Sequence, residues 1–289
     1  MLNRTALFST VIVSVGLVLL SACAKKQAVE NPKDLIAKGW NNYTLYEFDQ
    51  AVAKFTAAAD APEIDDRLFA LYGLATTWNL RRPGEDPKKA VELYNRIIRE
   101  APEHDLAAWS LLALARMKHL VPVGEDPDYE EVRKAYQEVI RRFPNHLAGK
   151  EAFIYLSSVL VSSLNRENAK KAAVDLEEYV KVPSNTFAGP AYSLLAVAYT
   201  TLGNPGKRLE SEILSLQNTE VDPTNPFTEF SWQYWNIATI AEFDVGDFDT
   251  ARFYYKKLIA EYPTDIRVYS AKKALQRMDQ LEEKIRAEL

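Results

Sequence analysis

The sequence predicts an all-α fold built from repeated helix–turn–helix units, and three observations support this prediction. The chain of 289 residues contains only 10 glycines, which argues against a turn-rich all-β fold. Its 14 prolines fall mostly between segments of helical periodicity, where proline begins or ends helices. The clearest unit runs from Trp235 to Asp265, and much of the preceding chain looks like imperfect copies of it.

In this unit, residues fall on one helical face on each side of a Gly246-Asp247 turn. The first helical face carries Trp235, Ala238, Thr239 and Glu242. The second face carries Ala251, Tyr255 and Leu258 at positions i, i+4 and i+7. Pro263 then ends the second helix. Two helices joined by a tight turn are therefore expected.

The copies share a small or apolar residue followed four positions later by a larger one. These pairs are Ala51/Phe55, Ala90/Tyr94, Val132/Tyr136, Ala172/Leu176 and Ala251/Tyr255. The fifth unit departs from the pattern, with Arg208 and Glu212 at the two positions. Prolines such as Pro102 and Pro144 follow the larger residue by eight positions. The small residue lets two helices approach, and the large one fills the space between units.

This pattern resembles that of the tetratricopeptide repeat family, W-x2-L-G-x2-Y followed by A-x3-F and a proline. The resemblance implies an all-α helical solenoid of about six units over residues 34–265. The units are longer than the family's 34 residues, and the extra residues fall mostly at turns. Residues 266–289 predict one more amphipathic helix, which would cap the solenoid. A partner-binding or coiled-coil helix is the alternative for this last segment.

Two of the longer turns contain the same tetrapeptide, Gly84–Pro87 and Gly124–Pro127. An Asp followed by Pro is a helix-start signal, with Asp as N-cap and Pro in the first helical position. A calcium site is the alternative. It is weaker, because two carboxylates per turn fall short of the ~6 to 8 oxygens that Ca²⁺ prefers.

The N-terminus predicts a membrane address. Arg4 precedes an uncharged apolar run over residues 6–20, too short to span a bilayer and typical of a secretory signal. Residues 20–23, Leu-Ser-Ala-Cys, resemble the lipobox of bacterial lipoproteins. This implies a signal peptide over residues 1–22, a lipidated Cys23 and a tether over residues 23–33. The alternative is an incidental thiol, but Cys23 is the only cysteine of the chain. Ala24 favours the outer membrane, by resemblance to enteric lipoproteins.

The sequence gives no sign of catalysis. Its three histidines are dispersed without metal-ligand spacing, and neither a nucleophile elbow nor a phosphate-binding loop is present. We therefore expect no enzyme, no catalytic residue, no metal and no cofactor. A net charge of −5 makes the chain a poor candidate for nucleic-acid binding.

The resemblance also implies a concave groove lined by the first helix of each unit. Carrying the family's positions over places Trp40, Tyr43, Thr44, Leu74, Thr77, Trp78, Ile240, Phe243 and Asp244 in it. Related positions hold Arg67, Ser110 and Asn236. The binding candidates are Trp40, Tyr43, Arg67, Trp78, Asn236 and Phe243. Aromatic residues dominate protein-binding hot spots. The alternative is that these aromatic residues are ordinary core between units.

The predicted function is a non-catalytic, membrane-anchored scaffold on the periplasmic face of the outer membrane. Its groove would bind a protein or peptide partner in envelope assembly or export. Lipoproteins of outer-membrane assembly and pilus biogenesis with these repeats are the nearest analogues. The alternative is a small-ligand-binding accessory lipoprotein of a transport system. A deep apolar pocket would favour that alternative, and an open polar-rimmed groove would favour the scaffold.

Overall fold

The computed structural model describes residues 30–80, 82–182, 185–219, 221 and 229–288 of the protein. Within these ranges every regular element is helical, which confirms the predicted all-α class. The elements are α1 (Pro32–Thr44), α2 (Phe48–Ala58), α3 (Ile64–Asn79), α4 (Pro87–Glu100), α5 (Asp105–His119), α6 (Tyr129–Arg142), α7 (Leu147–Ser162), α8 (Arg166–Val180), α9 (Ala188–Leu202), α10 (Pro205–Gln217), α11 (Ser231–Thr239), the π-helix η1 (Ile240–Val245), α12 (Phe248–Glu261) and α13 (Val268–Glu288).

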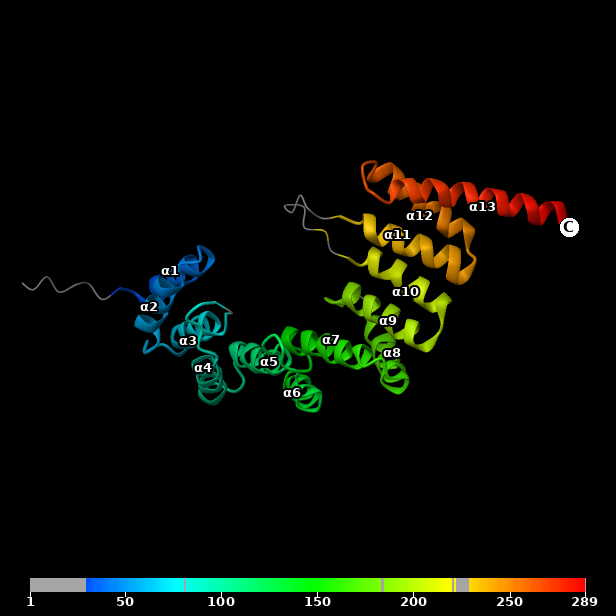
Figure 1. The fold of residues 1–289 in the computed structure, drawn as a ribbon. Helices are drawn as coiled ribbons and strands as arrows, with labels where there is room; N and C mark the ends of the chain where they lie inside the picture. Colours follow the sequence, from blue (N-terminus) through cyan, green and yellow to red (C-terminus); the bar gives the residue numbers. More distant parts are fainter. Residues whose placement is uncertain (1–29, 81, 183–184, 220, 222–228, 289) are drawn as a thin grey trace, which may run out of the picture.

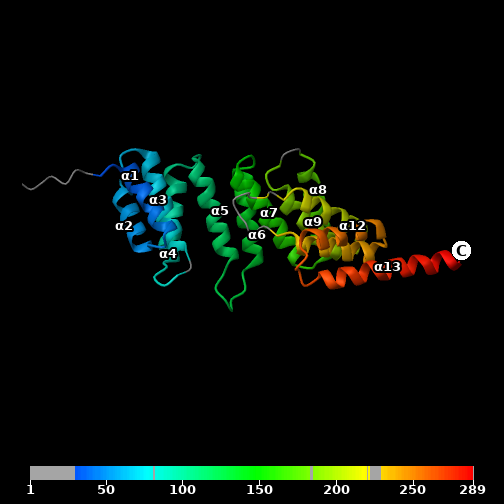
Figure 2. The ribbon, with the colours of Figure 1, turned by 90° about the horizontal axis from the view of Figure 1, so that it is seen from above.

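The helices pack as consecutive pairs, and each pair stacks on the next along a curved array (Figure 1). The described chain holds six such pairs, from α1/α2 to α11–η1/α12, followed by α13. Helix α13 packs along α12, and its C-terminal end extends beyond the rest of the array (Figures 1 and 2). This arrangement confirms the predicted solenoid of about six units with a C-terminal helix.

Short polar side chains start most second helices. In the first of the two repeated turns, the Asp86 carboxylate accepts a hydrogen bond from the Lys89 amide at 3.1 Å, as expected of an N-cap. In the second, the predicted cap at Asp126 is wrong. Helix α6 starts two residues later because the Asp128 carboxylate accepts from two amides, those of Glu130 and Glu131, at 3.0 and 3.1 Å.

The repeat pattern has a simple packing cause in the first two units. Phe55 is fully buried, and its ring lies against both Gly39 of its own unit and Gly73 of the next. A Cβ would lie 2.6 Å from the ring at Gly39 and 2.4 Å at Gly73, so no larger residue fits without a shift. The same small-then-large pair is buried in α4, α6 and α12. One large side chain thus joins two neighbouring units.

The predicted register of the fourth unit is wrong by three residues. In the units with the clear pattern, the small residue lies four positions after the N-cap. In α8 the N-cap is Asn165, so the equivalent residue is Ala169, not Ala172. Ala172 fitted the sequence pattern because it is followed four residues later by the larger Leu176, and it is also buried.

The fifth unit keeps the predicted register, but polar residues occupy the two positions that are small and large in the other units. The amide of Arg208 donates to the carbonyl of the N-cap Asn204, which places Arg208 and Glu212 at the two pattern positions. Burial raises the pKa of the Glu212 carboxyl, although a hydrogen bond with Asn236 opposes the shift. The core contact between units is therefore partly polar here.

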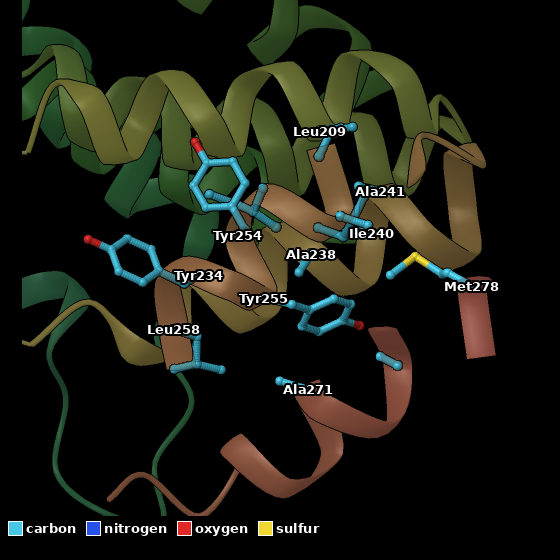
Figure 3. Packing of buried hydrophobic residues seen from close by; sticks show 13 residues of the cluster. Leu209, Tyr234, Ala238, Ile240, Ala241, Tyr254, Tyr255, Leu258, Ala271 and Met278 are labelled. Carbon is cyan, nitrogen blue, oxygen red and sulfur yellow. The ribbon is translucent and has the colours of Figure 1, made fainter. Parts of the chain in front are cut away.

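In the last unit, the first helix ends in a π-helical segment, which contains a buried carboxylate. Glu242 lies in η1 with its side chain almost fully buried. Its carboxylate accepts from the Tyr255 hydroxyl at 2.9 Å and from the Arg277 guanidinium at 2.5 and 2.9 Å. Figure 3 shows Tyr255 between the last unit and α13, whose Ala271 and Met278 face the same cluster. This network ties α13 to the array.

Positive φ angles occur at the turns that join the first helix of a unit to its second. Four of these residues are glycines, Gly84, Gly124, Gly203 and Gly246. Two are not: Tyr46 has φ 62° and Leu164 has φ 53°. For a residue with a Cβ, the left-handed region costs roughly 1–2 kcal/mol. The chain therefore carries local strain at two turns where glycine would avoid it.

Candidate functional site

A groove of about 540 Å³ crosses the first helices of the first three units. Its lining residues come mainly from the C-terminal halves of α1, α3 and α5. They are Tyr43, Tyr72, Thr76, Asn79, Leu80, Tyr94, Ala113, Arg116, Met117 and Leu120. Aromatic rings, hydroxyls, one amide and one guanidinium thus line one surface, which suits a segment with both apolar and polar groups.

Tyrosine hydroxyls supply much of the polarity of this groove. The Tyr72 and Tyr94 rings meet edge to face with centroids 5.8 Å apart, and the Tyr94 hydroxyl lies 3.4 Å from the Thr76 hydroxyl. Burial raises the pKa of Tyr72 to about 12 and also raises the pKa of Tyr94. Both phenols therefore stay protonated at neutral pH and can donate hydrogen bonds.

Arg116 carries the formal charge among the residues that line the groove. Its guanidinium lies 5.4 Å from the Tyr155 ring centroid and 3.8 Å from the Glu151 carboxylate. The side chain is 45% exposed, so a ligand can reach it. Tyr155 in turn stacks on Tyr136 with centroids 5.5 Å apart. The aromatic surface therefore continues from the third unit into the fourth.

Of the six predicted binding residues, Tyr43 lines this groove. The half-buried Trp40 ring lies edge to face with the rings of Phe55 and Tyr43, at centroid distances of 5.1 and 5.6 Å. Trp78 is also half-buried against the Phe55 cluster, and the Lys89 ammonium lies 4.6 Å from its ring centroid. Both tryptophans thus contribute to packing between units, and a binding role for them stays a prediction.

The other three predicted residues lie elsewhere. Arg67 donates to the Ala61 carbonyl at 2.8 Å and pairs with Glu100 at 3.1 Å. Asn236 and Phe243 belong to the sixth unit. Phe243 is 64% exposed, and the Arg277 guanidinium lies over its ring, 5.1 Å from the centroid. The structure therefore does not gather the six residues into one site.

Three of the family positions carried over from the repeat pattern are core instead. Leu74, Thr77 and Ile240 are all buried. Counted from Gly73, the predicted groove positions were +1, +4 and +5, whereas Thr76 and Leu80 line the groove at +3 and +7. At about 100° per residue, the lining of α3 is rotated to the other side of the helix, whereas on α1 the predicted +4 position, Tyr43, does line the groove.

Arg116 was missed by the sequence argument. It stands three residues after Ala113, which occupies the glycine position of its unit, as Thr76 stands three after Gly73. The signal that could have found it is this +3 position. A charged residue there is informative because Thr76, at the same position of the preceding unit, is uncharged.

The N-terminal predictions lie outside the described residues. They concern the signal peptide over residues 1–22, Cys23 and most of the tether up to residue 33. Within the part of the chain that the structure describes, no helix has the length and apolarity needed to cross a bilayer. In the same part, no group of three or more His, Cys, Asp or Glu side chains is placed to hold a metal ion.

Comparison with known proteins agrees with this architecture. The family model described as "Tetratricopeptide repeat" matches residues 233–265, the unit that shows the clearest sequence pattern. The solved structure of Pseudomonas aeruginosa pilF is 16% identical, with a TM-score of 0.53 over 84% of this chain and 96% of that one. A tetratricopeptide repeat protein from Parabacteroides merdae is 14% identical, with a TM-score of 0.47 over 88% and 86% of the two chains. No curated protein matches the sequence. The chain therefore contains one matched tetratricopeptide repeat, at residues 233–265, within an all-α helical solenoid.

Proposed function

We propose that the protein is a non-catalytic scaffold of the cell envelope, which binds a protein segment in the groove across α1, α3 and α5. The single observation that carries this proposal is the groove itself, about 540 Å³ in volume and lined by three successive units. Solenoids of this kind present extended binding surfaces rather than enclosed active sites. The partner is expected to be a segment that lies along the array.

The character of the groove favours a protein segment over a small ligand. A small-ligand site is usually an enclosed, mostly apolar pocket. Here Arg116 and Leu120 are exposed and Tyr43 and Tyr72 are only partly buried, so the surface is open. Its hydroxyls and its guanidinium can pair with backbone and side-chain groups of a peptide. The accessory role in transport therefore remains the second candidate.

The envelope location is supported by the N-terminal sequence. Cys23 follows an uncharged run of signal-peptide length and is the only cysteine of the chain. Acyl chains on this residue would anchor the protein stably, because each buried CH₂ contributes about 0.8 kcal/mol. Helix α1 begins at Pro32, so a lipidated Cys23 would hold the array close to the membrane surface. We place the protein on the periplasmic face of the outer membrane.

We expect Arg116→Glu to weaken partner binding while leaving the fold intact. A photo-crosslinking residue at Met117 should form an adduct with a protein in intact cells, and the same residue at Lys134 on α6 should not. Arg116→Glu should reduce the Met117 adduct about tenfold, equivalent to about 1.4 kcal/mol of binding free energy. The melting temperature should change by only a few degrees, because Arg116 is well exposed.

The matched control is Arg141→Glu, another charge reversal at an exposed arginine, located on a second helix. It should leave the Met117 adduct unchanged. Equal adducts from Met117 and Lys134, or an equal effect of the two charge reversals, would contradict binding in the groove. A small molecule rather than a protein attached at Met117 would favour the transport role.

We expect Cys23→Ser to abolish membrane attachment. In detergent phase separation the wild-type protein should enter the detergent phase, and the variant should stay in the aqueous phase or keep its signal peptide. The mass of the mature wild-type protein should exceed that of residues 23–289 by acyl chains. Unchanged partition and unchanged mass in the variant would refute lipidation.

A further inference from the structure

Large apolar side chains project into solvent at the turns that join first to second helices in the units α1/α2, α5/α6 and α7/α8. We call this surface the turn edge. It is formed by Leu45, Tyr46, Leu120, Val123 and Leu164. Val123 is 100% exposed, Tyr46 81% and Leu164 76%. Because helices alternate in direction, these turns lie on the same edge of the array. Figure 2 shows the α3–α4 and α5–α6 turns projecting side by side.

The backbone at two of these residues adopts a left-handed conformation that costs stability. Tyr46 and Leu164 are the described non-glycine residues with positive φ, and both belong to the turn edge. The equivalent turns of other units use Gly203 and Gly246. Among the described residues, the Tyr46 ring makes one ring contact, with Phe48 at a centroid distance of 6.0 Å, and it is mostly exposed, so packing does not account for the residue. Strained residues of this kind recur at functional surfaces.

The charge of the turn edge indicates what it binds. By sequence, the turns at residues 45–47, 80–86, 120–128 and 163–165 carry six carboxylates and two arginines. Arg82 is turned inward, with its guanidinium 4.7 Å from the Phe48 ring centroid. Because the N-terminal ends of α2, α4, α6 and α8 point to the same edge as the C-terminal ends of α1, α3, α5 and α7, the helix dipoles offset one another, and the carboxylates set the charge. The surface is thus apolar and electronegative.

The turn edge is continuous with the groove. Leu80 and Leu120 line the groove, and each is the first residue after its helix, at the start of a projecting turn. A bound chain that leaves the groove at this end therefore meets the turn edge directly. The edge is nevertheless a separate surface, because Tyr46, Val123 and Leu164 do not line the groove.

We propose that the turn edge is a second docking surface, which takes a basic amphipathic segment of a partner protein. The leucine, tyrosine and valine side chains contact the apolar face of that segment. The carboxylates attract its lysines and arginines. The same negative charge opposes an anionic bilayer, which attracts basic surfaces. The proposal does not require the groove to be occupied.

The test uses the full-length chain and a fluorescent 18-residue amphipathic peptide of leucine and lysine. We expect Tyr46→Gly/Leu164→Gly to weaken peptide binding at least fivefold in fluorescence anisotropy. Because glycine relieves the positive φ, the melting temperature should stay equal or rise. Val123→Ser should weaken binding as well, at a side chain too exposed to affect folding. Raising the salt concentration should weaken binding to the wild type.

The controls separate this surface from a general attraction between opposite charges. Ile266→Ser and Tyr269→Ser remove exposed apolar residues at the far end of the array and should leave binding unchanged. A peptide of leucine and glutamate should not bind. Equal binding by wild type and the glycine variant, or an early-melting glycine variant, would overturn the proposal. The proposal would also be overturned if the glycine variant lost binding to phosphatidylglycerol vesicles but still bound the peptide, because the turn edge would then face the bilayer.

Discussion

Replacing Phe55 with alanine should lower the free energy of unfolding by about 3–5 kcal/mol. The Phe55 side chain is fully buried, and its ring lies against glycines of two neighbouring units, Gly39 and Gly73. Neither glycine has a side chain that could move into the space left behind. The variant therefore loses the burial of the ring and keeps a cavity. Urea denaturation followed by circular dichroism measures the effect.

The location of the loss is also predictable. Units of a solenoid contact only their neighbours, so a weakened interface between the first two units should loosen the N-terminal end first. Hydrogen exchange should accelerate in α1–α3 more than in α11–α13. The control is Phe69→Ala on α3, where the ring is nearly half exposed and the loss should be much smaller. Equal losses in the two variants would show that Phe55 does not join the units as described.

Replacing Arg277 with methionine should lower the free energy of unfolding by about 3 kcal/mol, the lower end of the range for breaking a buried ion pair. The guanidinium donates two hydrogen bonds to Glu242, whose carboxylate is almost fully buried. Without it, the carboxylate keeps the Tyr255 hydroxyl as a partner but loses its counter-charge. We use the lower end because Arg277 itself is half exposed. Limited proteolysis should then cut α13 before the rest of the array.

A second substitution tests whether the buried charge causes this loss. Glu242→Gln in the Arg277→Met background removes the unpaired carboxylate, so the double variant should be more stable than Arg277→Met alone. Lys273→Met, on an exposed face of the same helix, is the matched control and should change stability little. An Arg277→Met variant as stable as wild type would show that α13 is held by its apolar contacts alone.

The aromatic residues illustrate how far a repeat pattern can locate a binding surface. Trp40 and Trp78 were predicted to form part of a groove wall, with core packing as the alternative. In the structure both pack against the Phe55 cluster, while Tyr43 reaches the groove three residues after Trp40. A shift of one residue turns a helical side chain by about 100°. The pattern could therefore identify the helix that lines the groove but not the face.

The sequence by itself determined the all-α class, the pairing of helices and the position of the last unit, because these follow from local signals. Helical periodicity, N-caps such as Asp86 and the Ala251/Tyr255 pair act within one unit. Tertiary structure alone decided the groove and the turn edge. Tyr43, Arg116 and Leu120 meet only because three units stack with a particular rotation, which depends on side chains more than 30 residues apart. Short-range patterns carry no information about that rotation, since it is set by how the units pack.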